Sequence, residues 1–204
     1  MKSYIWGPYF WYLFHFITFN YDHEKIQIYK QFFNNIKYIL PCPICRTHYS
    51  KFIDKYKPDK YLNSKDNFIK WMIDFHNIVN KGLKKKQINY SDALNLYKQY
   101  DISKFFKMFN LLLEDPVNEN FYNYKLFFQY ISYIFPCKKI RNQLFINYFQ
   151  NQKYINNFND LRYWLHINLN KIITNSYLIE YDSIIVDCFK FNYTEYYYNW
   201  KLCL

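Results

Sequence analysis

The sequence predicts an all-α protein. Only 2 of its 204 residues are glycine, which leaves little material for primed hairpin turns or for a phosphate-cradling loop. Apolar residues recur at steps of three and four along the chain, as they do on amphipathic helices. Residues that favour helix N-termini stand ahead of several of these segments. A chain of this length can form one large domain or two small ones with a buried core.

Four helical segments and a short fifth follow one another over the first hundred residues. The first carries an apolar stripe, made by Trp6, Phe10, Leu13, Phe14 and Ile17. Pro8 is expected in the first turn of this helix, where its missing N–H does no harm. The later helices are expected to begin at a capping residue or a proline, namely Asp22, Pro43, Ser64 and Ser91. The fifth is predicted to end near Tyr100.

Cys42 and Cys45 are two residues apart and can form and reopen a small disulfide loop. Proline at position 43 suits the first position of a helix, which places Cys42 at the helix cap and Cys45 one turn inside. The positive end of a helix lowers the pKa of a thiol, and disulfide exchange requires a thiolate. The spacing therefore indicates redox chemistry.

Other uses of this cysteine pair stay open at this point. A structural zinc site needs four ligands, and His48 and His76 would have to complete it at an unusual spacing. A dithiol–disulfide exchanger without flavin needs no further motif. Covalent haem attachment needs histidine directly after the second cysteine, where Arg46 stands.

Three polar residues lie on the predicted fourth helix. His76 and Asn80 are one turn apart, and Asn77 lies beside them. Asparagine is a poor helix former and is costly to bury unpaired. We therefore expect a polar partner at this position.

Charge and hydropathy argue against a nucleic-acid site and against a membrane span. The net charge of +11 is scattered along the chain and accompanies a general abundance of Lys, Asn, Ile, Tyr and Phe, so no nucleic-acid site is predicted. The apolar stretch from Tyr4 to Phe19 contains Gly7, Pro8 and His15 and is too short for a membrane span of about 20 residues. We interpret it as a buried helix, with no signal peptide and no membrane span.

Three motifs in this order resemble those of the Erv/ALR family of flavin-linked sulfhydryl oxidases. The first is represented by Trp6, Gly7, Pro8, Trp11 and His15. The second, Pro-Cys-x-x-Cys-x-x-His, is represented by Pro41, Cys42, Cys45 and His48. The third is represented by Trp71, His76, Asn77, Val79, Asn80, Leu83 and Lys85.

The resemblance implies a four-helix bundle plus a short fifth helix that encloses FAD non-covalently. It implies that a substrate thiolate attacks Cys42, that Cys45 lies against the flavin, and that electrons pass to O₂ and yield H₂O₂. Thiol-containing proteins are then the substrates, and a homodimer is expected. The implied cofactor residues are Trp6, Gly7, Trp11, His15, Cys45, His48, His76, Asn77, Asn80, Lys85 and Tyr90.

The second half of the chain repeats the first at a shift of 95 residues, with Pro136 and Cys137 on Pro41 and Cys42. At this shift Ile140 replaces Cys45, so a self-contained redox pair is lost. We therefore predict an oxidase domain over residues 1–100 and a second, degenerate helical bundle, a pseudo-oxidase domain, over residues 101–204.

Such an arrangement of one active and one degenerate domain resembles the sulfhydryl oxidases of baculoviruses. This resemblance implies that the enzyme acts in the host cytoplasm, the host nucleus or the virion. Two cysteines near the end of the chain, Cys188 and Cys203, are structural, free or mutually paired thiols, or a shuttle for electrons. The sequence leaves these alternatives open.

Overall fold

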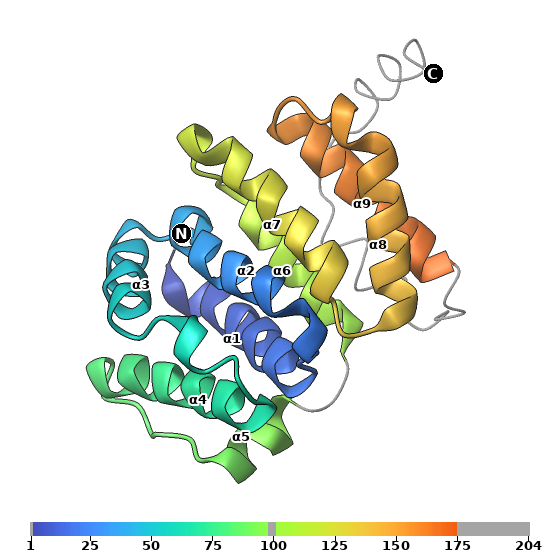
Figure 1. Ribbon diagram of the computed structural model, residues 1–204. Helices are drawn as coiled ribbons and strands as arrows, with labels where there is room; N and C mark the ends of the chain where they lie inside the picture. The colour runs from blue at the N-terminus through green and yellow to red at the C-terminus, as the bar shows by residue number, and fades with distance from the viewer. Residues whose placement is uncertain (1, 98–100, 175–204) are drawn as a thin grey trace.

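The computed structural model describes residues 2–97 and 101–174, whose arrangement is shown in Figure 1. Every regular element in these two ranges is helical, which confirms the all-α prediction for them. The α-helices are α1 (Ser3–Phe19), α2 (Ile26–Ile39), α3 (Pro43–Lys55), α4 (Lys65–Gly82), α5 (Tyr90–Tyr97), α6 (Ile102–Glu114), α7 (Phe121–Ile134), α8 (Lys138–Asn151) and α9 (Phe158–Thr174). Cys188 and Cys203 lie outside the described residues.

Helix α1 begins earlier than the sequence suggests. It starts at Ser3, so Pro8 lies inside the helix and not in its first turn. Proline has no N–H to donate to the carbonyl four residues earlier, which is that of Tyr4. Tyr4 is exposed, so water can satisfy its carbonyl and the helix continues through the proline.

The next three helices begin close to where their caps predict. The Asp22 carboxylate accepts from the Glu24 N–H at 3.2 Å and so caps a 3₁₀ turn, His23–Lys25, that leads into α2. Cys42 is the N-cap of α3, as predicted from Pro43. The Ser64 hydroxyl accepts from the Asn67 N–H at 3.2 Å, which confirms Ser64 as the N-cap of α4.

The predicted cap of α5 is wrong. Helix α5 begins at Tyr90, which places Ser91 inside its first turn. The Asn89 side-chain oxygen accepts from the Asp92 N–H at 2.8 Å, and this is the N-cap geometry that Ser91 was expected to supply. Asparagine caps helices at least as well as serine, so the first good cap in the chain is the one used.

The core of the first half is aromatic. Helix α1 packs against α4, and α2 packs against α3. The ring of Phe33 meets those of Phe14, Phe68 and Trp71 at centroid distances of 5.6, 5.4 and 5.2 Å. The Phe68 and Trp71 contacts are edge-to-face, a geometry that adds about 0.5–1.5 kcal/mol per pair to the burial of the rings. These rings fix the relative positions of α1, α2 and α4.

The helices of the second half follow the same order and nearly the same register. Helix α7 begins and ends 95 residues after α2 (121 − 26 and 134 − 39). Helix α8 begins 95 residues after α3 (138 − 43), and α6 ends 95 residues after α1 (114 − 19). Helix α9 begins 93 residues after α4 (158 − 65), a slip of two residues.

Contacts recur at this register as well. The edge-to-face pair Phe32–Phe33, with centroids 5.0 Å apart, has a counterpart in Phe127–Phe128 at 5.2 Å, and both have an interplanar angle of 87°. The Arg46 guanidinium donates from Nη1 to the Leu40 carbonyl at 2.7 Å. Its counterpart Arg141 donates in the same way to the Phe135 carbonyl at 3.0 Å.

Equivalent helices of the two halves also meet each other. Helix α1 packs against α6, and α2 packs against α7, as Figure 1 shows for the neighbouring ribbons of α2 and α7. Phe32 contacts its own counterpart Phe127 with ring centroids 5.6 Å apart. Asn35 and Asn123 join the helices by two hydrogen bonds, from Asn35 Nδ2 to the Asn123 carbonyl at 2.8 Å and from Asn123 Nδ2 to Asn35 Oδ1 at 2.9 Å.

Candidate active site

The cysteine pair forms a disulfide at the N-terminus of α3. Cys42 and Cys45 are bonded to each other, with their Cα atoms 5.1 Å apart, and both residues are half-buried. Cys42 Sγ also accepts a hydrogen bond from the Cys45 N–H at 3.2 Å. A backbone N–H at a helix N-terminus stabilises negative charge, so the same contact favours the Cys42 thiolate once the disulfide opens.

Two hydrogen bonds anchor this turn to α2 and its C-cap. One is the bond from Arg46 to the Leu40 carbonyl, and the other runs from the Tyr49 hydroxyl to the Phe33 carbonyl at 2.8 Å. Ile44, between the two cysteines, is 68% exposed, so the outer side of the disulfide loop is open to a partner. The turn is therefore held from inside and accessible from outside, as an exchange site requires.

Four aromatic and imidazole rings form a second group, which we call the histidine cluster. It consists of Trp11 and His15 from α1, His76 from α4 and Tyr97 from α5. Trp11 stacks on His76 with centroids 3.9 Å apart, and His15 stacks on Tyr97 at 4.3 Å. A hydrogen bond of 2.9 Å joins His15 Nε2 and His76 Nδ1. The structure thus brings together three residues that the sequence predicts for the cofactor site.

Burial keeps both imidazoles of the cluster neutral. It lowers the pKa of His15 well below its usual value, and the neighbouring His76 adds to this effect. Burial also lowers the pKa of His76 to about 4, with a smaller contribution from the charge of Lys85. The Nδ1 atom of His15 is buried and has no hydrogen-bond partner among the described residues. A buried atom of this kind calls for a partner, and the described residues do not provide one.

The side chains of Asn77 and Asn80 form hydrogen bonds with the backbone of the segment that follows α4. Asn77 makes a reciprocal pair of hydrogen bonds with the backbone of Ile88, both of 2.8 Å. Asn80 Nδ2 donates to the Lys86 carbonyl at 3.1 Å. Both side chains therefore hold the segment that leads from α4 to α5. Lys85, within this segment, is exposed.

The other predicted cofactor residues lie in different surroundings. Trp6 is buried against Phe10, with Nε1 unpaired among the described residues. A Cβ added at Gly7 would meet nothing within 4 Å, so packing does not require glycine there. His48 is exposed on α3, and Tyr90 is exposed at the start of α5.

Sequence reasoning missed Tyr97 as a member of the cluster. The available signal was the spacing of Ala93, Leu94 and Tyr97, which places an apolar face on the short fifth helix. Ala93 is fully buried, so this face does turn inward. Contact with His15, 82 positions earlier (97 − 15), could not be predicted from periodicity.

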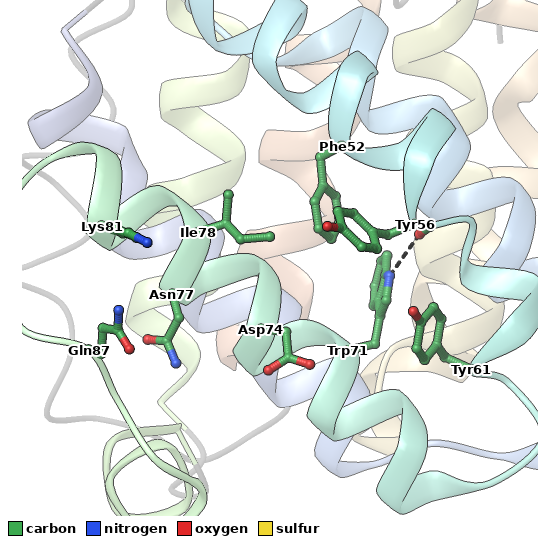
Figure 2. Close-up of a pocket in the computed structure, with 9 residues that line it drawn as sticks. All are labelled: Phe52, Tyr56, Tyr61, Trp71, Asp74, Asn77, Ile78, Lys81 and Gln87. Atoms are coloured by element: carbon green, nitrogen blue, oxygen red, sulfur yellow. Dashed lines mark hydrogen bonds between the residues drawn. The ribbon is translucent and has the colours of Figure 1, made fainter.

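A cavity of about 370 Å³ opens on the other side of α4. Figure 2 shows the rings of Phe52, Tyr56, Tyr61 and Trp71 at one end, where the Trp71 Nε1–H donates to the Tyr56 carbonyl at 2.9 Å. Polar side chains surround the remainder, and these are Asp74, Asn77, Lys81 and Gln87. Of the predicted cofactor residues, only Asn77 lines it.

Neither a metal-ligand cluster nor a membrane helix is found in the described part of the chain. Within residues 2–97 and 101–174, no three His, Cys, Asp or Glu side chains are placed to bind one metal ion together. None of the helices in these ranges combines the length and the apolar character that a bilayer crossing needs.

Comparison with known proteins places the similarity in the first half. The sequence profile of the Erv1/Alr family matches residues 8–101. A probable FAD-linked sulfhydryl oxidase of Acanthamoeba polyphaga mimivirus is 38% identical over 95 residues, which cover 44% of this chain and 66% of that protein. The FAD-linked sulfhydryl oxidase of an African swine fever virus isolate from Kenya is 35% identical over 99 residues, covering 46% of this chain and 81% of that protein. A putative FAD-linked sulfhydryl oxidase of invertebrate iridescent virus 6 is 38% identical over 94 residues, 42% and 85% of the two chains. No solved structure matches this chain.

Proposed function

This chain belongs to the Erv1/Alr family, and we propose that it is an FAD-linked sulfhydryl oxidase. It forms disulfide bonds in thiol-containing protein substrates and passes the electrons to O₂, which yields H₂O₂. The observation that carries this proposal is the Cys42–Cys45 disulfide at the N-terminus of α3, exposed on one side and anchored on the other. This site needs no additional residue to begin thiol–disulfide exchange.

The exchange reaction uses groups of this chain in two steps. A substrate thiolate attacks Cys42 Sγ, the Cys42–Cys45 bond breaks, and Cys45 leaves as a thiolate. A second substrate thiolate then attacks the mixed disulfide at the substrate sulfur, so the oxidised substrate departs and Cys42 becomes a thiolate. The Cys45 N–H, 3.2 Å from Cys42 Sγ, stabilises that charge. Two electrons now reside in the cysteine pair.

FAD, when bound, supplies the two-electron acceptor that returns the cysteine pair to the disulfide and delivers the electrons to O₂. The histidine cluster suits this group because it offers aromatic faces and a buried, unpaired His15 Nδ1. Neutral imidazoles can pair with polar ring edges without adding charge. Lys85 adds a cation for the pyrophosphate. We retain the other predicted binding residues as proposals, namely Trp6, Gly7, Cys45, His48, Asn77, Asn80 and Tyr90.

We propose further that residues 101–204 are a degenerate copy of the oxidase domain in residues 1–100. Support comes from the common register of 95 residues and from the recurring contacts of Phe127, Phe128 and Arg141. Cys137 stands where Cys42 would be and is a free thiol, with Ile140 in place of a second cysteine. Residues 101–174 therefore keep counterparts of α1 to α4, and Ile140 breaks the redox pair, as in the baculovirus-like arrangement.

The expected homodimer has to use a face other than that of α1 and α2. Helices α6 and α7 already pack on those two helices within one chain. We place the work of the enzyme in host cytoplasm, nucleus or virion, in keeping with its viral relatives. These two proposals are independent of the redox chemistry.

The experiment that tests the oxidase activity is oxygen uptake on a reduced protein or dithiothreitol. Cys45→Ser should abolish oxygen uptake while the protein retains bound FAD, because the exchange step loses its leaving thiolate. Cys137→Ser is the matched control, since it changes the cysteine at the equivalent position of the second half. It should consume oxygen at the wild-type rate. Equal uptake by wild type and Cys45→Ser would refute the proposed function.

A further inference from the structure

Three consecutive backbone carbonyls at the C-terminal end of α2 each accept a hydrogen bond from a side chain. Asn120 Nδ2 donates to the Tyr38 carbonyl at 2.7 Å. The Tyr124 hydroxyl donates to the Ile39 carbonyl at 3.3 Å. Arg46 Nη1 donates to the Leu40 carbonyl at 2.7 Å. The last carbonyls of a helix have no partner within it, so these three side chains complete the end of α2.

Two of the three donors come from the second half of the chain. Asn120 stands at the start of α7, and Tyr124 lies one turn further along that helix. The Tyr124 ring is fully buried, and so is Ile39, whose carbonyl it reaches. Only two residues, Leu40 and Pro41, separate this carbonyl from Cys42. The second half thus touches the segment that determines where the first cysteine of the redox pair lies.

Tyr124 is held in place by bonds on both sides. Its oxygen accepts from the Val117 N–H at 3.1 Å while its hydrogen points to Ile39. Tyr29, the equivalent residue of the first half, accepts in the same way from the Asp22 N–H at 3.1 Å. Tyr29 therefore offers the same chemistry at a place remote from the Cys42 turn.

We propose that Asn120 and Tyr124 are positioning residues for the Cys42–Cys45 disulfide, through which the second half fixes the end of α2. This inference rests on the proposed function of the pair as a redox disulfide. A fixed backbone holds the two thiols at a high effective concentration and so favours the disulfide over the dithiol. When the Ile39 carbonyl loses its donor inside the protein, the last turn of α2 loosens and the disulfide becomes easier to reduce.

The test is the anaerobic equilibrium of the full-length holoprotein with mixtures of reduced and oxidised dithiothreitol. In this exchange two electrons and two protons pass from dithiothreitol to the Cys42–Cys45 pair, and dithiothreitol closes its own disulfide. Alkylation followed by mass spectrometry of the peptide with Cys42 and Cys45 gives the ratio of dithiol to disulfide. The variants are Asn120→Ala with Tyr124→Phe, and the matched control Tyr29→Phe.

The dithiol-to-disulfide ratio should rise about threefold to tenfold in the double variant at a given dithiothreitol mixture, as expected from the two hydrogen bonds lost at the end of α2. Tyr29→Phe should leave this ratio at the wild-type value. The single variant Asn120→Ala removes a half-buried side chain that makes no cap bond of its own, so it tests the same point if the double variant does not fold. Its ratio should rise about twofold or more.

Two results would count against the inference, and they can be distinguished. If the wild-type pair exchanges with dithiothreitol but the folded variants show the wild-type ratio, or Tyr29→Phe shows the same rise, the positioning role is wrong and the proposed function stands. If the wild-type pair stays oxidised in every mixture, the proposed function fails, and the positioning role fails with it.

Discussion

His15 and His76 share a hydrogen bond inside the first half, in a position where neither can be charged at low cost. His15 is fully buried and His76 nearly so. The two imidazoles form one donor–acceptor pair. His15 Nδ1 lies outside this pair, is buried and has no hydrogen-bond partner among the described residues. Protonation of both rings would place two positive charges in hydrogen-bond contact, close to the charge of Lys85. The cluster therefore depends on neutral histidines.

This dependence predicts a loss of stability in mild acid. The pKa of His76 is about 4 in the folded protein and about 6.5 in the unfolded chain, so the unfolded chain binds more protons between these values. Stability due to His76 is complete above pH 6.5 and falls as the pH drops toward 4. At pH 5 the loss should be about 2 kcal/mol relative to pH 7. Urea unfolding of wild type and His76→Gln at both pH values measures it.

The result is read as a difference between the two proteins. The free energy of unfolding of His76→Gln should fall less between pH 7 and pH 5 than that of wild type, because glutamine does not titrate. Equal losses in both proteins would contradict the assignment of a low pKa to His76.

Single residues differ in how well the sequence predicts them. The cap position of Cys42 follows from Pro43 alone, because the constraint that proline imposes is local. The family motifs imply that His15 and His76 belong to one site, but the hydrogen bond between them was not predicted, since 61 positions separate the two residues. The use of Asn77 and Asn80 on the α4–α5 segment was not predictable, because it depends on the path of a loop that has no periodic pattern.

Among the elements, α5 shows most clearly how one capping residue sets a helix boundary. The Asn89 side chain accepts from the Asp92 N–H, and Ser91 lies exposed one residue inside the helix. This short helix carries Tyr97 to the face of His15. Its start therefore bears on the geometry of the histidine cluster.

Asn89→Ala should lower the free energy of unfolding by about 1 kcal/mol, because it removes the bond to a free N–H of the first turn. Ser91→Ala is the matched control at the same helix end. It should leave the stability within about 0.5 kcal/mol of wild type, since alanine is a good helix former and no cap bond is lost. Urea unfolding of the two variants separates these results, and a larger loss for Ser91→Ala would show that the assigned cap is wrong.

Helix order was more predictable than helix ends. The apolar stripes predict α1 to α5 in their observed order, because each stripe reflects burial of one face. The start of α1 at Ser3 was not predicted, since proline usually marks a first turn and here lies beyond it. Proline is tolerated inside α1 because Tyr4, whose carbonyl loses its N–H donor, is exposed to water. The sequence does not reveal this exposure, because it depends on the folded structure.

At the scale of the whole molecule, the described helices of the two halves follow nearly the same register, and α1 and α2 pack against their counterparts α6 and α7. A shift of 95 residues aligns Pro136 and Cys137 with Pro41 and Cys42, and it also relates the first residues of α7 and α8 to those of α2 and α3. That α1 meets α6 and α2 meets α7 is not visible in the sequence, because all four helices carry similar apolar stripes. The contact of Phe32 with Phe127 and the paired Asn35 and Asn123 specify the chosen arrangement. The Cys42–Cys45 turn follows the end of α2, where Asn120 and Tyr124 of the second half donate to the Tyr38 and Ile39 carbonyls.

The most direct test of the redox assignment is the visible flavin absorbance of the purified protein during anaerobic addition of a dithiol. We predict that the wild-type protein carries FAD, that its absorbance is bleached by the dithiol, and that the colour returns when air is admitted. The same addition of dithiol should leave the flavin absorbance of Cys45→Ser unchanged over the time in which the wild-type protein is bleached. A wild-type protein that purifies with an intact Cys42–Cys45 disulfide but neither carries nor takes up FAD would contradict the account, as would equal bleaching of Cys45→Ser.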